Sequence, residues 1–248
     1  MLRFLHWTEK LVEDLTREGL LQAVKHQENI SLLHTEKYLL IIYYPHSERI
    51  KPTVDKKIIH LDIDLLASAY FKVLDRIRSL CGRGRRLFAR NTVVARIDKG
   101  MALAFLEEYH LQVALAGKYR YGLFYKGDLV SVAVFSGGRR MRDQSAEYRS
   151  FELLRFCHKG GYLIVGGISK LLKAFIEDFK PDDIMTYADR DWSDESSLTR
   201  IGFKEEGRTE GQLFYIREGR RYYTLGEGES YDYIVKNTGS IKLKLYLS

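Results

Sequence analysis

Two hydrophobic periods alternate along the chain of 248 residues, and each predicts a different kind of element. Apolar residues at helical spacing predict helices over Phe4 to about Gln27, Asp64 to about Leu80, and Asp98–His110. Short β-rich or alternating runs predict strands at Lys37–Tyr44, Lys57–Ile63, Thr92–Ile97, Tyr119–Tyr125, Leu129–Phe135, Gln212–Ile216, Arg221–Leu225 and Lys242–Leu247. The pattern therefore predicts an α/β chain.

The clearest unit of this pattern lies between Phe151 and Phe203. A β-rich strand at Phe151–Cys157 is extended or followed by Tyr162–Val165, and a helix then begins at a pair of glycines. The apolar residues of that helix keep to one stripe: Leu171, Leu172, Phe175, Ile176 and Phe179. Because another strand follows at Asp183–Tyr187, we expect a parallel strand pair joined by a right-handed crossover.

The start of this helix is a candidate anion site. Glycines let the backbone turn freely and come close to a ligand. The first turn of a helix also offers unpaired N–H groups and the positive end of the helix dipole. We therefore expect a pyrophosphate to bind at Val165, Gly166, Gly167, Ser169 and Lys170. The alternative is an ordinary glycine turn into a core helix, because the segment matches neither G-x-G-x-x-G nor a P-loop.

Positive charge is in excess and clustered. The net charge is +7 and the pI about 9.2, which indicates an anionic partner such as nucleic acid or a phosphorylated cofactor. The arginines gather between Arg76 and Arg90 and again near residue 140. The predicted nucleic-acid contacts are Arg83, Arg85, Arg86, Arg139, Arg140 and Arg142. Solvated surface charge is the alternative for both clusters.

Several classes of protein are disfavoured. Two cysteines and seven histidines without H-x-x-x-H spacing argue against a disulfide framework or a structural metal. The apolar runs are too short to span a bilayer, and the N-terminal stretch carries acidic residues, so we expect a cytoplasmic protein without membrane contact. Asp62 and Asp64 are spaced like the carboxylates of a metal-dependent nuclease. Because no E-x-K element follows in a strand, we favour the alternative, in which Asp62 lies at a strand end and Asp64 caps the next helix.

The order of elements in residues 91–225 resembles the Gcn5-related N-acetyltransferase (GNAT) family. The resemblance implies a mixed central sheet of acetyltransferase type in residues 91–248, with a small N-terminal α/β extension in residues 1–90. It also implies acetyl-CoA or another acyl-CoA as cofactor, held at the glycine turn. Gly167-Ile168-Ser169 fits the end of the family signature, whereas Ile164 stands where an arginine or glutamine is usual.

A longer run of sequence is similar to a narrower group. FELLRFCHKG, VGGISKLLKAFI and the YADRDWS segment resemble the C-terminal domain of phage homing-endonuclease-like proteins. The tyrosine-alanine-aspartate step also resembles phage acyltransferases that modify adenine. The resemblance covers about Asp62 to Tyr215 and implies a phage-related protein associated with DNA.

Acyl transfer to an amine needs a base for the acceptor nitrogen and an acid for the leaving thiolate. Glu152 and Asp189 are the candidate bases, and Tyr187 is the candidate acid. Arg155 joins Glu152 on one face only if their strand is bulged, because a regular strand sends the two to opposite faces. Ion pairing or core packing is the alternative for these four residues. Two functions follow: an acyl-CoA-dependent N-acyltransferase, with a nucleic-acid base as a candidate acceptor, or a nucleic-acid-binding module without catalysis.

Overall fold

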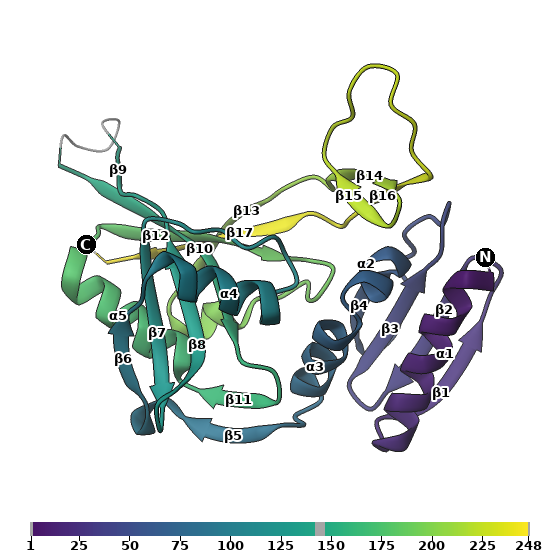
Figure 1. Cartoon of the computed structure of the whole chain (residues 1–248), viewed down its shortest axis with the longest axis horizontal. Helices are drawn as coiled ribbons and strands as arrows, with labels where there is room; N and C mark the ends of the chain where they lie inside the picture. Colours follow the sequence, from purple (N-terminus) through teal and green to yellow (C-terminus); the bar gives the residue numbers. More distant parts are fainter. Residues whose placement is uncertain (1, 142–146, 248) are drawn as a thin grey trace. The chain divides into compact units, whose positions relative to one another are not determined.

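The computed structural model describes residues 2–141 and 147–247, which form two compact units (Figure 1). Unit 1 comprises residues 1–74, 188–196 and 208–241, and unit 2 comprises residues 75–187, 197–207 and 242–248. Each unit therefore combines stretches that are far apart in the sequence. The division expected after residue 90 stays a prediction.

Unit 1 is built on a sheet with strand order β1-β2-β3-β4, in which β1, β2 and β3 are antiparallel and β4 runs parallel to β3. A smaller sheet has the order β15-β14-β16. The elements are α1 (Leu2–Arg17), β1 (Leu21–His26), β2 (Ile30–Thr35), β3 (Tyr38–Tyr43), β4 (Lys57–Asp62), α2 (Ile63–Ser68), α3 (Tyr70–Leu80, which runs on into unit 2), β14 (Leu213–Arg217), β15 (Arg220–Tyr222) and β16 (Tyr233–Lys236).

The helix predicted from Phe4 to Gln27 is shorter than expected. It ends at Arg17, and residues 21–26 form a strand instead. Gly19 ends the helix, because it adopts a left-handed conformation (φ +65°) that lets the N–H of Leu20 bond to the carbonyl of Leu15 at 2.9 Å. Leu21 and Val24, which continue the helical spacing by chance, therefore belong to β1.

Unit 2 is organised by a mixed sheet of order β13-β17-β12-β10-β8-β7-β6, with β9 beside β10. Strands β10 and β12 are parallel, as the strand–helix–strand pattern predicted. Its elements are β5 (Arg85–Phe88), η1 (Ala89–Asn91), β6 (Val93–Arg96), α4 (Lys99–Tyr109), β7 (Tyr119–Tyr125), β8 (Asp128–Phe135), β9 (Arg139–Arg140), β10 (Arg149–His158), β11 (Tyr162–Val165), α5 (Gly167–Phe179), β12 (Asp183–Asp189), η2 (Ser197–Ile201), β13 (Lys204–Arg208) and β17 (Ser240–Tyr246).

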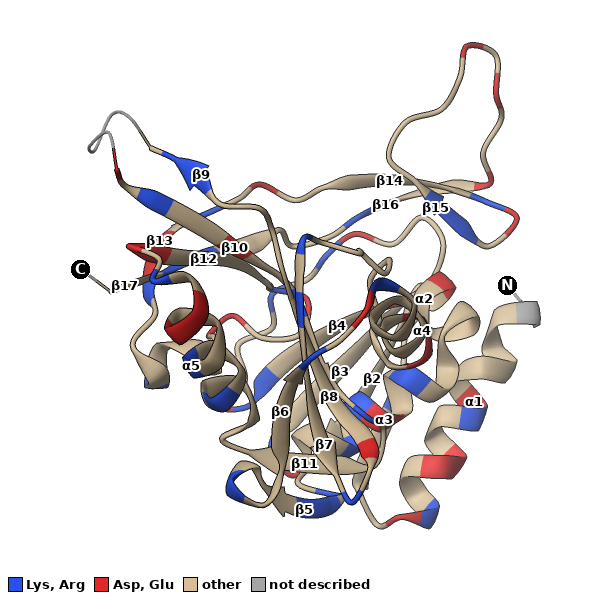
Figure 2. Cartoon of the chain, turned by 60° about the vertical axis from the view of Figure 1, so that its left-hand side comes forward, with Lys and Arg blue, Asp and Glu red and all other residues tan. Residues whose placement is uncertain are grey.

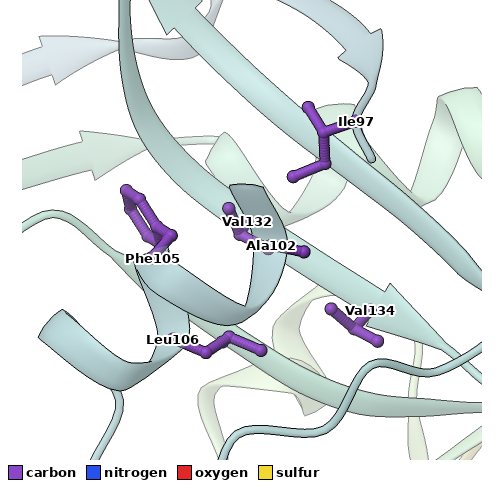
Figure 3. Packing of buried hydrophobic residues seen from close by; sticks show 6 residues of the cluster. All are labelled: Ile97, Ala102, Phe105, Leu106, Val132 and Val134. Atoms are coloured by element: carbon purple, nitrogen blue, oxygen red, sulfur yellow. The ribbon is translucent and has the colours of Figure 1, made fainter. Parts of the chain in front are cut away.

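The two long helices of unit 2 cover opposite faces of this sheet. Successive residues of β8 point to opposite sides, so Phe135 stacks on Phe175 of α5 at 3.9 Å, whereas Val134 faces α4. The α4 face is packed by six buried residues shown in Figure 3: Ile97, Ala102, Phe105, Leu106, Val132 and Val134. The apolar stripe of α5 thus packs on one face of the sheet, and the apolar residues of α4 pack on the other.

The expected fold class, a mixed α/β sheet with a smaller N-terminal α/β part, is confirmed. Short strands were the elements that the hydrophobic pattern missed, among them β5, which pairs in parallel with β11 outside the main sheet. Within residues 2–141 and 147–247, no helix is long and apolar enough to cross a membrane.

Candidate functional site

Strands β10 and β12 separate part of the way along their length. Their ladder joins Ser150 to Asp183 and ends at the pair Glu152 and Met185, although both strands continue beyond it. At the point of separation, the hydroxyl of Thr186 donates a hydrogen bond to the carbonyl oxygen of Leu153 at 2.8 Å. The side chain thus satisfies a carbonyl that the neighbouring strand no longer reaches.

Strand β10 is also bulged at this point. Its antiparallel register with β8 shifts between Leu153, which pairs with Phe135, and Arg155, which pairs with Val134. Phe135 lies on the α5 face and Val134 on the α4 face, so the extra residue, Leu154, reverses the alternation of side chains.

The bulge brings Arg155 to the face that also carries Glu152. Phe151 packs edge-to-face on Phe175 of α5, so its neighbour Glu152 points to the α4 face. On that face the guanidinium of Arg155 donates to the carbonyl oxygens of Val113 (2.9 Å) and Leu154 (2.7 Å). The bulge that Glu152 and Arg155 need in order to share one face is therefore present.

Tyr187 shares that face of the sheet. It lies two residues after Met185, which is the register partner of Glu152, and paired residues of parallel strands point to the same side. The Tyr187 side chain is 46% exposed, and Glu152 is half-buried. Within unit 2, Glu152, Arg155 and Tyr187 are thus on one face near the point where β10 and β12 separate.

Asp189 lies in unit 1. It is the last residue of β12, and its Oδ1 accepts a hydrogen bond from the backbone N–H of Asp191 at 3.0 Å. Its proposed role as a base stays a prediction from the sequence.

The glycine turn opens α5 as predicted. Gly166 is the residue before the helix, is exposed, and has φ +77°, a conformation that other residues adopt at a cost. Gly167 is buried, and a Cβ there would lie 2.8 Å from Cε1 of His158 and 3.1 Å from a methyl of Ile164. The second glycine is therefore required by packing within the protein. Ser169 is exposed in the first turn of the helix, and Val165 is 46% exposed just before it.

Lys170 is held by backbone oxygens. Its ammonium donates to the carbonyl of Ala89 at 2.9 Å and to the carbonyl of Thr92. The lysine therefore ties η1 and the start of β6 to the first turn of α5.

A neutral histidine lies beneath this turn. The hydroxyl of Ser131 donates to the carbonyl of Cys157 at 3.1 Å, so Nδ1 of His158 donates to Ser131 Oγ at 2.9 Å. Burial lowers the pKa of His158 to about 4. An uncharged imidazole therefore supports the turn at neutral pH.

The arginines predicted to bind nucleic acid are at the surface. Figure 2 shows positive residues along β5 and β9, and Arg83, Arg85, Arg86, Arg139 and Arg140 are all exposed. The guanidinium of Arg85 lies 5.6 Å from the ring centre of Tyr125 and 5.7 Å from that of Tyr162. Arg142 lies outside the described residues.

Asp62 and Asp64 form ion pairs that neither interpretation of the sequence included. Asp62 ends β4 as expected, but Asp64 is not the helix cap, because α2 begins at Ile63 and leaves Asp64 in its first turn. Both carboxylates are buried and bind Arg221: Nε donates to Asp64 at 2.6 Å and a terminal nitrogen to Asp62 at 2.9 Å. Arg49 binds Asp62 with two hydrogen bonds, of 2.6 and 3.0 Å.

The same network includes a third carboxylate that the sequence did not single out. Asp191 is 7% exposed, binds Arg49 at 3.2 Å and accepts two hydrogen bonds from Thr238. Burial raises its pKa to about 6, against the opposing attraction of Arg49. With two guanidiniums bound to three carboxylates, this is an ion-pair network in the core of unit 1. In the described part of the chain, no group of three or more His, Cys, Asp or Glu side chains is arranged so that it could hold a metal ion.

No family model matches the chain, and no curated protein matches it. Solved structures of GNAT-family acetyltransferases are similar to it. The ribosomal-protein-S18-alanine N-acetyltransferase from Escherichia coli is 11% identical, with a TM-score of 0.43, over 63% of this chain and 94% of that one. A GNAT acetyltransferase from Streptococcus pneumoniae is 12% identical, with a TM-score of 0.42, over 63% and 99%.

A third similar structure is a GNAT-family acetyltransferase from Elizabethkingia anophelis, solved with acetyl-CoA bound. It is 12% identical, with a TM-score of 0.35, over 63% of this chain and 99% of that one. At these identities and TM-scores the likeness carries no conclusion about activity.

Proposed function

We propose that unit 2 is an acyl-CoA-dependent N-acyltransferase. The observation that carries the proposal is the separation of β10 from β12 directly after Glu152, on a strand that leads to the exposed glycine turn of α5. Strand edges without a ladder partner offer backbone groups to an extended ligand. The helix start offers N–H donors to a pyrophosphate. The acyl-CoA would bind along β10 with its pyrophosphate at Val165, Gly166, Gly167 and Ser169, while Lys170 holds the turn in place.

The residues on the α4 face provide the acid–base chemistry. The acceptor amine attacks the thioester carbonyl, and Glu152 removes its proton directly or through water. The C–S bond then breaks, and Tyr187 gives a proton to the departing thiolate. Arg155 shares the face of Glu152 and orients the acceptor beside it. The proposal concerns unit 2 alone, so Asp189 is not part of it.

Thiol release from acetyl-CoA tests this proposal. We expect turnover with an amine acceptor, and a loss of about 100-fold or more in Glu152→Gln with unchanged acetyl-CoA affinity, because general-base catalysis contributes roughly that much. Glu107→Gln, an exposed position of α4, is the matched control. The acceptors to compare are simple alkylamines, adenosine and single-stranded DNA. Equal rates for the Glu152→Gln and parent proteins would refute the assigned base.

The acceptor that we favour is a nucleic-acid base, in line with the resemblance to phage proteins. The exposed arginines of β5, with Arg85 between Tyr125 and Tyr162, offer charge for phosphates and rings on which bases stack. The same observation supports the second candidate function, a nucleic-acid-binding module without catalysis.

Salt dependence and turnover together distinguish these two functions. Fluorescence anisotropy with single-stranded DNA is expected to show affinity that falls steeply with salt, and Arg86→Ala is expected to reduce the log–log slope by about 0.7. DNA binding without thiol release for any acceptor would favour the binding module. A flat salt response would exclude nucleic acid as the partner of this surface.

A further inference from the structure

An aromatic ring and a guanidinium stand exposed beside the glycine turn, and neither has a part in the chemistry above. Phe88, the last residue of β5, is the register partner of Val165, which directly precedes the turn. Its side chain is 40% exposed, which is unusual for a large apolar residue in a strand. The guanidinium carbon of Arg90 lies 5.0 Å from the centre of the Phe88 ring, and Arg90 is exposed as well.

The position of this pair relative to the turn is fixed by the chain itself. The backbone of β5 is bonded to β11, and the two hydrogen bonds of Lys170 hold Ala89 and Thr92 against the first turn of α5. The approach is close, because a Cβ placed on Gly166 would lie 3.7 Å from the Cβ of Ala89. A ligand bound at the turn would therefore lie beside β5 and η1, which carry Phe88 and Arg90.

We infer that Phe88 and Arg90 bind the adenosine 3′-phosphate end of coenzyme A. The inference rests on the proposed function, in which the pyrophosphate of the same molecule binds at the turn. The pyrophosphate of CoA is linked to an adenosine that carries a further phosphate on its ribose. Adenine stacks on aromatic faces, and a guanidinium binds a phosphate through paired N–H donors. Phe88 holds the base, and Arg90 selects for the 3′-phosphate.

This role of Phe88 and Arg90 suggests a function for the two-stranded sheet of β5 and β11, which is separate from the main sheet. The signature position that usually carries an arginine or glutamine is occupied by Ile164, which is buried and pairs with Leu87 of β5. The strand pair that buries Ile164 also ends in Phe88 and leads to Arg90. A cationic contact absent at the signature position is thus supplied from β5 and η1.

Binding of CoA and dephospho-CoA, which differ only in the 3′-phosphate, tests the inference by calorimetry. The parent protein is expected to bind CoA roughly threefold to fivefold more tightly than dephospho-CoA, as one exposed charge pair allows. Arg90→Ala is expected to abolish this preference and to leave dephospho-CoA affinity within about twofold. Lys99→Ala removes one positive charge from an exposed position of α4 and is expected to retain the preference. Phe88→Ala is expected to weaken both ligands.

The outcomes separate this inference from the proposed function. Equal affinity of the parent for the two ligands, or equal weakening of both by Arg90→Ala, would overturn the role of Arg90 while acyl-CoA binding stands. A loss of DNA affinity in Arg90→Ala with the CoA preference intact would assign the pair to nucleic acid and would also overturn it. Failure of the parent to bind either ligand would remove the proposed function as well.

Discussion

The arginines of the ion-pair network in unit 1 and those of β5 and η1 in unit 2 have opposite surroundings. In unit 1, Arg49 and Arg221 bind three carboxylates whose side chains are at most 10% exposed. In unit 2, the arginines of β5 and η1 are exposed, and their neighbours on the surface are aromatic rings. Charged groups that are buried and bound to one another are not available to a ligand, whereas exposed guanidiniums beside aromatic rings are. A charged cluster in a sequence indicates a binding surface only when its partners are not in the same chain.

The largest expected effect comes from breaking the network of unit 1. Arg221→Met would remove a bound cation from the two buried carboxylates Asp62 and Asp64, of which Asp62 keeps Arg49. Loss of one partner from a buried network costs roughly 3–5 kcal/mol. Chemical denaturation measures this loss. Arg220→Met, at the exposed neighbouring position of β15, is the control and is expected to change the free energy of unfolding by less than about 0.5 kcal/mol. Similar effects of both substitutions would mean that the network contributes nothing special to stability.

The next effect concerns the pH dependence of stability that His158 gives to unit 2. Its pKa is about 4 in the folded protein and 6.5 when unperturbed, so between these values the unfolded chain binds a proton that the folded protein does not. Stability is expected to fall as the pH is lowered from 6.5 to 4, by roughly 2–3 kcal/mol from this residue. In His158→Asn, which keeps a donor for Ser131, the unfolding free energy is expected to depend less on pH.

Unit 1 has two buried titratable groups, and they change the stability of the folded protein in opposite directions as the pH falls. Burial lowers the pKa of His60 to about 4 and raises that of Asp191 to about 6. As the pH falls from about 6 to 4, the first destabilises the folded protein, while the second takes up a proton more readily when folded and stabilises it. The contributions of His60 and Asp191 to the pH dependence of stability therefore oppose each other.

For His158 in unit 2, a pH dependence of stability that is unchanged by His158→Asn would contradict the burial of a neutral histidine beneath the turn.

Much of the arrangement of unit 2 was readable from the sequence because its signals are local. The glycine pair, the apolar stripe of α5 and the strands around it are consecutive, so the helix start and the parallel strand pair were predicted. The sequence showed that Glu152 and Arg155 would need a bulge to share one face, but it did not predict the bulge, because a bulge depends on the register of β10 with β8. The role of Lys170 depends on Ala89 and Thr92, about 80 residues away, and no local pattern indicates that contact.

The network of unit 1 was hidden for the same reason. Arg221 lies 159 residues from Asp62 in the sequence, and Asp191 lies 142 residues from Arg49. Asp62 and Asp64 were noticed for their spacing, yet spacing cannot show which cations neutralise them. Likewise, the helical spacing that ran on through Leu21 and Val24 could not show that Gly19 ends the helix.

The most direct test of the central claim, that an acyl-CoA binds at the start of α5, is calorimetry with acetyl-CoA on Ser169→Glu. Ser169 is exposed in the first turn of α5. A carboxylate added there interacts favourably with the helix dipole but repels an anionic ligand. Ser169→Gln has the same shape without the charge. We predict that Ser169→Glu binds acetyl-CoA at least about tenfold more weakly than Ser169→Gln, while melting no lower than the parent. Equal affinities of the glutamate and glutamine variants, or no binding by the parent, would contradict it.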